Sequence, residues 1–198
     1  MRREMNIDGF LAKVDKYLKE NLTTERYEHT YRVQEVAMKL ARKYDVSINK
    51  AKVAALFHDC VKDFDKKKKR RLAKQNFIIL DDHMLRNIEL AHGVIASSIA
   101  YEKFEIFDED VLAAIKFHTT GRNDMSDIEK IIFIADAIEP HRDLPEEFNN
   151  ILEVALEDLS KATVMILKYK LRTLMAKKVE VHPFTFRAIN FLTDSYVY

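Results

Sequence analysis

Apolar residues recur at intervals of three and four positions along most of this 198-residue chain. This spacing gathers them on one face of an α-helix, whereas a half-buried strand would need strict alternation. With only 3 glycines and 3 prolines, the chain also has few residues that could interrupt helices. The pattern therefore predicts an all-α protein. We expect helices at residues 7–20, 24–44, 49–61, 89–104, 109–118, 126–138 and 145–176, and a last helix that starts near Pro183.

The sequence contains no internal repeat and no low-complexity linker, so we expect residues 1–198 to form a single domain. A charged segment at 65–74 is followed by residues 77–80, which could form a turn or a short helix. The run of six basic residues at 66–71 could attract a polyphosphate. Such a run is more often the solvated face of a helix.

The composition of the chain argues against several classes of binding partner and against a membrane-spanning protein. The 33 basic residues nearly cancel the 32 acidic ones, so the net charge of +1 gives no reason to expect binding to nucleic acid or to a membrane surface. The longest apolar run, 131–135, is too short to span a bilayer, and no apolar stretch typical of a signal peptide follows the first residues. The single cysteine, Cys60, excludes an intrachain disulfide and suits a reducing compartment. We expect a cytoplasmic protein.

The apolar segment 51–57 is followed by His58 and Asp59. His58 follows Ala54 and Ala55 at helical spacing, and so it should face the buried side of its helix. An imidazole nitrogen and a carboxylate oxygen together suit Fe, Mn, Zn or Co. The simpler interpretation is a buried structural histidine beside an aspartate that ends the helix, because matches to so short a motif are common.

Two further residues are predicted to face the core. His29 lies one turn before Val33 on the apolar face of its helix, although a single buried histidine is more often structural. Asp136 directly follows the apolar run 131–135, where an ionised carboxylate is costly unless a metal, a cation or several donors compensate it. An ion pair with Arg142 is the alternative explanation for Asp136.

His92 and His118 lie at the predicted ends of helices. Either could be a helix-end histidine that interacts with backbone carbonyls, and His83 is expected on the surface. Taken together, however, five inward-facing His or Asp positions lie on five predicted helices. Side chains that converge from neighbouring helices are how a helical bundle forms a metal site.

The order His, His-Asp, His, His and Asp resembles that of the HD-domain metal phosphohydrolases. Within that superfamily the chain is most similar to the YqeK-like symmetrical diadenosine tetraphosphatases. The blocks that carry the resemblance are RYEHT at 26–30, ALFHDCVKD at 55–63, AHG at 91–93, HTTG at 118–121, IADAIEPHR at 134–142 and HPFT at 182–185. The resemblance implies an HD-type helical core at about residues 24–140, with C-terminal helices within 145–198 packed on it.

The resemblance also implies a set of site residues. The metal ligands would be His29, His58, Asp59 and Asp136, and the metal would most often be iron, with Mn, Co or Zn as alternatives. The side chains around the substrate phosphates would be Arg26, Lys62, His92, His118 and Arg142. Ala137 would touch the nucleotide, and the loop 179–183 its base or ribose. A second metal could lie near His92 and His118.

The reaction implied is the hydrolysis of a dinucleoside tetraphosphate into two nucleoside diphosphates. We expect Asp59, Lys62 and His118 to be the catalytic residues. Asp59 could orient the attacking water, and Lys62 could balance charge on the leaving group. The ligand would be a dinucleoside polyphosphate or a nucleoside diphosphate, and a homodimer is a further expectation.

The sequence leaves other functions open. Another HD-domain phosphohydrolase, such as a nucleotidase or an alarmone or cyclic-nucleotide phosphodiesterase, would use the same ligands on a different substrate. A nucleotide sensor without catalytic activity would retain the fold. A helical adaptor would need no metal.

Overall fold

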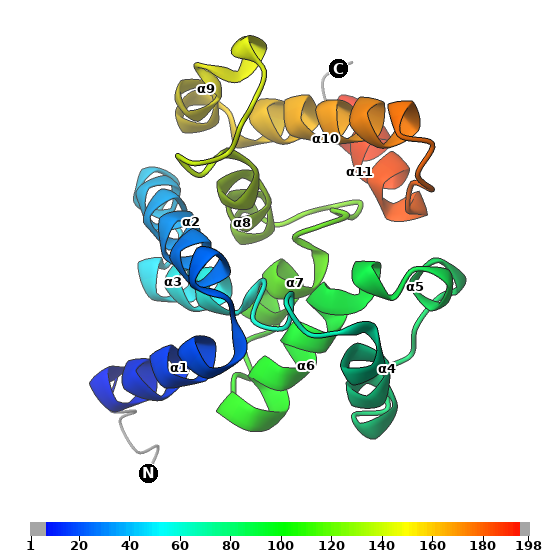
Figure 1. Ribbon diagram of the computed structural model, residues 1–198. Helices are drawn as coiled ribbons and strands as arrows, with labels where there is room; N and C mark the ends of the chain where they lie inside the picture. Colours follow the sequence, from blue (N-terminus) through cyan, green and yellow to red (C-terminus); the bar gives the residue numbers. More distant parts are fainter. Residues whose placement is uncertain (1–6, 195–198) are drawn as a thin grey trace.

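The structure, a computed structural model, describes residues 7–194, and the regular structure of this part is entirely helical (Figure 1). The all-α prediction is therefore confirmed. The elements are α1 (Ile7–Asn21), α2 (Thr24–Lys43), α3 (Ile48–Phe57), α4 (Lys66–Gln75), α5 (Asp82–Arg86), η1 (Ile88–Ala91), α6 (His92–Phe104), α7 (Glu109–Phe117), α8 (Asp127–Ile138), η2 (Glu146–Phe148), α9 (Ile151–Glu157), α10 (Leu159–Ala176) and α11 (Pro183–Asp194), where η denotes a 3-10 helix.

Helix α8 lies at the centre of the core. It packs against α2, α3 and α7 on one side and against α9 and α10 on the other. All five residues from 131 to 135 are fully buried, as the sequence predicted. A helix that is apolar all round has no solvent-facing side, so it must be covered by neighbours in every direction. Its position explains how a polar residue at its end can meet side chains from several other helices.

The predicted helix at 145–176 is wrong in its extent. The region contains η2, α9 and α10, and the break between the last two lies at Asp158, whose backbone is extended (φ −149°, ψ 103°). The side chain of Asp158 accepts a hydrogen bond from the backbone N–H of Lys161 and so caps α10. Short polar side chains that bond to nearby backbone favour such caps over a continuous helix.

Other boundaries also differ from the sequence-based prediction. The charged segment 65–74 is largely helix α4, which Asp65 caps. Residues 77–80 form neither a helix nor a tight turn beyond residue 77. The expected helix at 89–104 begins as the 3-10 helix η1, and the α-helix starts at His92.

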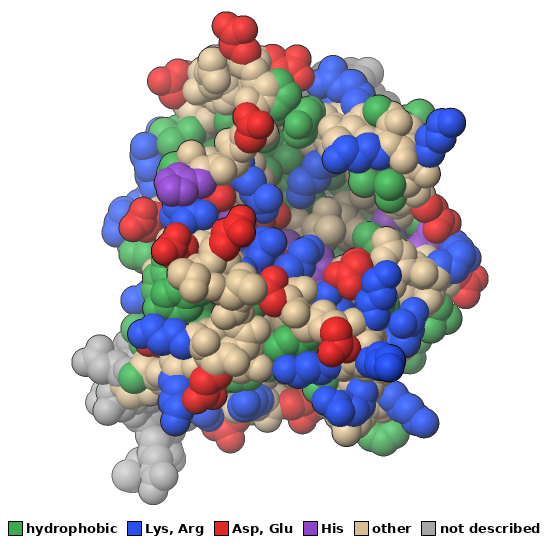
Figure 2. Space-filling model, viewed as in Figure 1, with side chains coloured by type: hydrophobic (Ala, Val, Ile, Leu, Met, Phe, Trp, Pro, Cys, Tyr) green, Lys and Arg blue, Asp and Glu red, His purple; other side chains and the backbone are tan. Residues whose placement is uncertain are grey.

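In Figure 1, α9, α10 and α11 lie in the upper part of the molecule and α1, α4, α5 and α6 in the lower part, while α8 lies beside α2. The space-filling view of the same face shows a hollow below the region of α10 and α11, with Lys, Arg and His side chains around it (Figure 2). Within residues 7–194, no helix combines the length and the apolar character needed to cross a membrane.

Candidate metal centre

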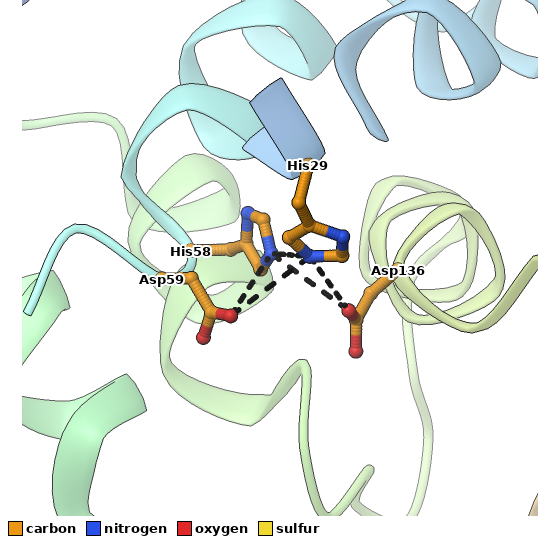
Figure 3. A group of neighbouring side chains, drawn as sticks. All are labelled: His29, His58, Asp59 and Asp136. Carbon is orange, nitrogen blue, oxygen red and sulfur yellow. Dashed lines mark hydrogen bonds and ion pairs between the residues drawn. The ribbon is translucent and has the colours of Figure 1, made fainter. Parts of the chain in front are cut away.

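The four predicted metal ligands lie together. His29 comes from the first half of α2, His58 and Asp59 directly follow α3, and Asp136 lies in the last turn of α8 (Figure 3). Their ligand atoms all lie within 4.8 Å of one another. The distance between His29 Nε2 and Asp136 Oδ1 is 3.3 Å, and that between His58 Nε2 and Asp59 Oδ2 is 3.7 Å. All four residues are nine-tenths or more buried.

The prediction that His29 and His58 face inward is thus confirmed at the level of position. The position of Asp136 agrees with both explanations for its burial, a metal site and an ion pair with Arg142. Its Oδ1 faces His29 and accepts a hydrogen bond from Arg142 Nη2 at 2.7 Å. The ion pair with Arg142 therefore forms part of the site rather than an alternative to it.

His92 and His118 form a second group around the other oxygen of Asp59. Their Nε2 atoms lie 3.2 and 3.4 Å from Asp59 Oδ1, and 3.0 Å from each other. The three residues are buried. Asp59 thus stands between two clusters, with Oδ2 toward His29 and His58 and Oδ1 toward His92 and His118.

The orientation of the four histidine rings is fixed from behind by their Nδ1 atoms. The contacts join His58 to Ala55 O (2.6 Å), His92 to Glu89 O (2.6 Å), His118 to Ile115 O (2.8 Å) and His29 to Glu139 Oε1 (3.2 Å). A carbonyl or carboxylate oxygen can only accept, so Nδ1 must carry the proton. In a neutral ring this leaves a lone pair on Nε2, aimed into the cluster.

Burial keeps the rings of His58 and His92 neutral. It lowers the pKa of His58 to about 4 and, with the nearby Lys62 ammonium, that of His92 to about 4. Burial alone would raise the pKa of Asp59, but His58, His118, His92 and Lys62 outweigh it and hold the pKa well below its usual range. At neutral pH the site therefore combines the uncharged imidazoles of His58 and His92 with the ionised carboxylate of Asp59.

Such an arrangement is unfavourable without a cation. Asp59 Oδ1 is buried and accepts no hydrogen bond, although the imidazole nitrogens of His92 and His118 lie next to it. The hydroxyl of Thr119 is 3.0 Å from the Nε2 of both histidines, and Lys62 Nζ is 3.2 Å from that of His92. These two donors can satisfy the histidines, but they leave the buried Asp59 Oδ1 without a donor. Lone pairs that face each other in a buried site fit a divalent metal, which would accept all of them.

Fixed cations surround this cluster. Arg26 Nη1 donates to Asp59 Oδ2 at 2.9 Å, and Lys62 Nζ lies 3.2 Å from His92 Nε2. Arg142 lies on the Asp136 side. Arg26 and Arg142 both line one groove, and Ala137 lines a neighbouring cavity with Asp136. The site therefore has positive charge on several sides of a buried polar centre.

The loop 179–183 pairs with the region of α5 instead of with the metal cluster. His182 Nε2 lies 2.8 Å from Asp81 Oδ2, and Glu180 pairs with Arg86 and His83. His83 is half-buried in these contacts, so the expectation of a plain surface residue was wrong. That the loop 179–183 contacts the base or ribose remains a prediction.

The sequence-based reasoning assigned no role to three residues of the site. Glu139 is buried beside His29 and forms an ion pair with Arg32, with Nε and Oε2 2.5 Å apart. Thr119 touches two of the histidines, and Lys170 lies in the cavity that Asp136 lines. Glu139 and Thr119 belong to the sequence blocks quoted for the resemblance, which was the available signal; nothing local marks Lys170.

Comparison with known proteins agrees with this geometry. The model of the HD domain family matches residues 26–141. A protein named "Bis(5'-nucleosyl)-tetraphosphatase, symmetrical" from Halalkalibacterium halodurans is 39% identical, over 90% of this chain and 95% of its own length. The protein of the same name from Bacillus subtilis is 35% identical, over 96% and 99%.

A solved structure is also similar. It is described as a predicted HD superfamily hydrolase involved in NAD metabolism from Clostridium acetobutylicum. The TM-score is 0.89 at 38% sequence identity, and the match covers 93% of this chain and 97% of the other. The chain therefore belongs to the HD-domain family and, within it, to the group that contains these symmetrical tetraphosphatases.

Proposed function

We propose that this chain hydrolyses diadenosine tetraphosphate symmetrically and releases two molecules of ADP. The observation that carries the proposal is the buried cluster, in which four imidazole Nε2 atoms and two carboxylates converge beside Arg26, Lys62 and Arg142. Relatives over nearly the full chain bear the name of this activity, which supports the choice of substrate.

The donor set fits a divalent metal. His29, His58, Asp59 and Asp136 would hold it, and we propose iron, although Mn, Co and Zn accept the same nitrogen and oxygen ligands. When bound, such a metal lowers the pKa of a water molecule and polarises a phosphoryl oxygen. Asp59 Oδ1, His92 and His118 would hold a second metal.

The reaction balances with water alone. The water oxygen forms a bond to one central phosphorus, and the bridging oxygen leaves with the second ADP and takes a proton. Asp59 can accept a hydrogen bond that orients the water. In a site without the second metal, His118 can hold a proton at Nε2 beside the phosphate. Lys62, Arg26 and Arg142 can balance the charge that develops on the phosphoryl oxygens, and Ala137 would touch the nucleotide.

Chromatography of the products tests this proposal. Metal-loaded protein should convert diadenosine tetraphosphate into ADP as the sole nucleotide product. ATP plus AMP, or faster release of phosphate from a monophosphate, would instead indicate another HD-domain phosphohydrolase. ADP binding without turnover would indicate a nucleotide sensor. Metal analysis of protein purified without added metal tests the choice of iron.

We further propose that residues 1–198 act as one domain in the cytoplasm. The packing of α10 on α8, the helix that carries Asp136, supports a single unit. Cys60 is buried and free, which suits a reducing compartment. The homodimer remains a prediction, which sedimentation of the purified protein would test.

A further inference from the structure

A cavity of about 240 Å³ adjoins the candidate metal centre between the end of α8, residues 142–148 and α10. Asp136 and Ala137 form part of its wall. The cavity therefore meets the metal cluster at Asp136, whereas His92 and His118 meet it at Asp59. A substrate that passes through the cluster could extend in both directions.

The walls of this cavity combine aromatic and aliphatic surface. The rings of Phe148 and Tyr169 lie 5.0 Å apart at an interplanar angle of 56°, and Leu144 and Ile166 complete the apolar part. Aromatic side chains bind nucleobases of any sequence by stacking, because every base has a π face. At this volume the cavity is smaller than the ~300–1,000 Å³ of sites that enclose a drug-sized ligand, so it suits a part of a dinucleotide.

The same cavity also presents two cations. Arg142 lines it while it donates to Asp136. The Lys170 ammonium lies over the ring of Phe133, 4.1 Å from its centroid, and no carboxylate lies within ion-pair distance of it in residues 7–194. Burial lowers the pKa of Lys170. The charge of Asp136 acts on Lys170 from beyond contact distance, so a bound phosphate would supply the direct ion-pair partner.

The neighbouring groove at Arg26 and Arg32 is less suited to a nucleoside. The described residues that line it include three glutamates and neither phenylalanine nor tyrosine. Arg32 is already paired with Glu139 and Glu28. This groove therefore offers no stacking surface, and its three glutamates offset its three arginines.

We propose that the cavity at Phe148, Tyr169 and Lys170 binds the second nucleoside diphosphate of the substrate. This inference rests on the proposed function, because symmetric cleavage leaves one nucleoside diphosphate on each side of the bond that breaks. Tyr169, backed by the buried ring of Phe148, stacks on the base of the second half, and Arg142 and Lys170 face its phosphates. The first half then occupies the side of Lys62, His92 and His118.

Calorimetric titration with ADP provides the first test. At ADP concentrations just sufficient to saturate the wild type, metal-loaded wild-type protein should bind two ADP molecules per chain. Under the same conditions Tyr169→Ala, with its second site about tenfold weaker, should bind close to one. Tyr101→Ala removes an exposed tyrosine of α6, which does not line the cavity, and should still bind two. A stoichiometry of one for the wild type, or of two for Tyr169→Ala, would overturn the proposal.

Discrimination between substrates provides the second test. Adenosine tetraphosphate contains the same anhydride but only one nucleoside. The ratio of kcat/KM for diadenosine tetraphosphate to kcat/KM for adenosine tetraphosphate therefore measures how much the second nucleoside contributes. Tyr169→Ala should lower this ratio about tenfold, the order expected for one lost base stack, and Tyr169→Phe should restore most of it. Lys170→Met should raise KM for the dinucleotide.

The two proposals fail in different ways. If the wild type releases two ADP from the dinucleotide but Tyr169→Ala leaves the ratio unchanged, only the second subsite is wrong. If the wild type releases no ADP at all, the proposed function is wrong as well. Circular dichroism melting of Tyr169→Ala and Tyr169→Phe separates lost binding from lost folding.

Discussion

Helix α8 carries a buried carboxylate near each end, and the two have opposite surroundings. Glu129, in the first turn, accepts hydrogen bonds from Arg122 Nε at 2.6 Å, from Arg122 Nη2 at 2.8 Å and from the backbone N–H of Ser126 at 2.9 Å. Asp136, in the last turn, accepts one from Arg142 and otherwise faces the Nε2 atoms of His29 and His58.

The difference separates a carboxylate that the protein itself satisfies from one that we propose as a metal ligand. Burial is similar at both ends of the helix, with exposed fractions of 1% for Glu129 and 9% for Asp136. What differs is the supply of hydrogen-bond donors. Arg122 and the backbone N–H of Ser126 donate to Glu129, whereas the imidazoles near Asp136 and Asp59 direct lone pairs at the carboxylates. A site whose acceptors face other acceptors is stabilised by a cation from outside the chain.

The largest expected effect is on the functional side of this comparison. Asp59→Asn removes the charge that joins the two histidine groups, and activity on diadenosine tetraphosphate should fall by more than about 100-fold. Loss of a residue behind a ligand already costs about 10–100-fold, so loss of the ligand should cost more. The steady-state rate at saturating metal measures this.

The metal-free Asp59→Asn protein should melt at the same temperature as the metal-free wild type or higher, since an unsatisfied buried charge is lost. Chelation should lower the melting temperature of the metal-loaded wild type but not that of the variant. A variant that loses activity only because it unfolds would contradict the comparison.

The second largest effect is expected on stability, at Glu129 in the first turn of α8. Glu129→Ala leaves Arg122 without its partner and removes the capping box of α8, so the free energy of unfolding should fall by about 2–3 kcal/mol, as for lost hydrogen bonds to a charged group. Urea denaturation measures it. Activity per folded molecule should stay within about twofold, and a large loss of kcat in the folded variant would show that the two ends are not independent.

Glu139 tests the boundary between the two classes. It satisfies His29 Nδ1 from behind and is itself satisfied by Arg32. Glu139→Ala should weaken metal binding by about 10–100-fold, the usual cost of losing a residue that orients a ligand. Glu139→Gln retains an oxygen for His29 and should weaken it less. Competition with a metal-binding dye measures both, and equal affinities for the two variants would contradict the role of that oxygen.

Much of the site followed from the sequence because its ligands lie at helical positions that face the core. His29 shares a face with Val33, and Asp136 follows a fully apolar run, so both had to be buried once the helices formed. The inward direction of a side chain is a local property. Which inward-facing side chains lie next to one another was predicted from the resemblance, because helical spacing within one segment does not show how five helices pack.

The parts that could not be predicted depend on contacts between distant segments. Glu139 lies 110 positions from His29, and Lys170 reaches its cavity from α10. The break of the predicted helix at Asp158 is a competition between a side-chain cap and helical propensity, which periodicity does not measure. The break at Asp158 and the 3-10 helix η2 also let Phe148 pack on Tyr169, which forms the cavity at Phe148, Tyr169 and Lys170.

The smallest expected effect comes from a third satisfied carboxylate, far from the metal centre. Asp15 joins α1 to α2, and it accepts hydrogen bonds from Tyr27 at 2.6 Å and Tyr31 at 2.8 Å and pairs with Lys19. Lys19 and the two hydroxyls lower the pKa of Asp15 to about 2 from an ordinary value of 3.8. Because the pKa is lowered in the folded state, the stabilisation is complete above the ordinary value and is lost as the pH falls through about 2.

Asp15→Asn should therefore reduce the free energy of unfolding by about 1 kcal/mol or less at pH 7, since the carboxylate is partly exposed and screened by solvent. The difference from the wild type should shrink as the pH falls from about 4 toward 2, and denaturation curves across this range measure it. Metal binding and activity should not change. A difference that stays constant with pH would mean that the tyrosine contacts act through packing, and that a satisfied carboxylate contributes little through its charge.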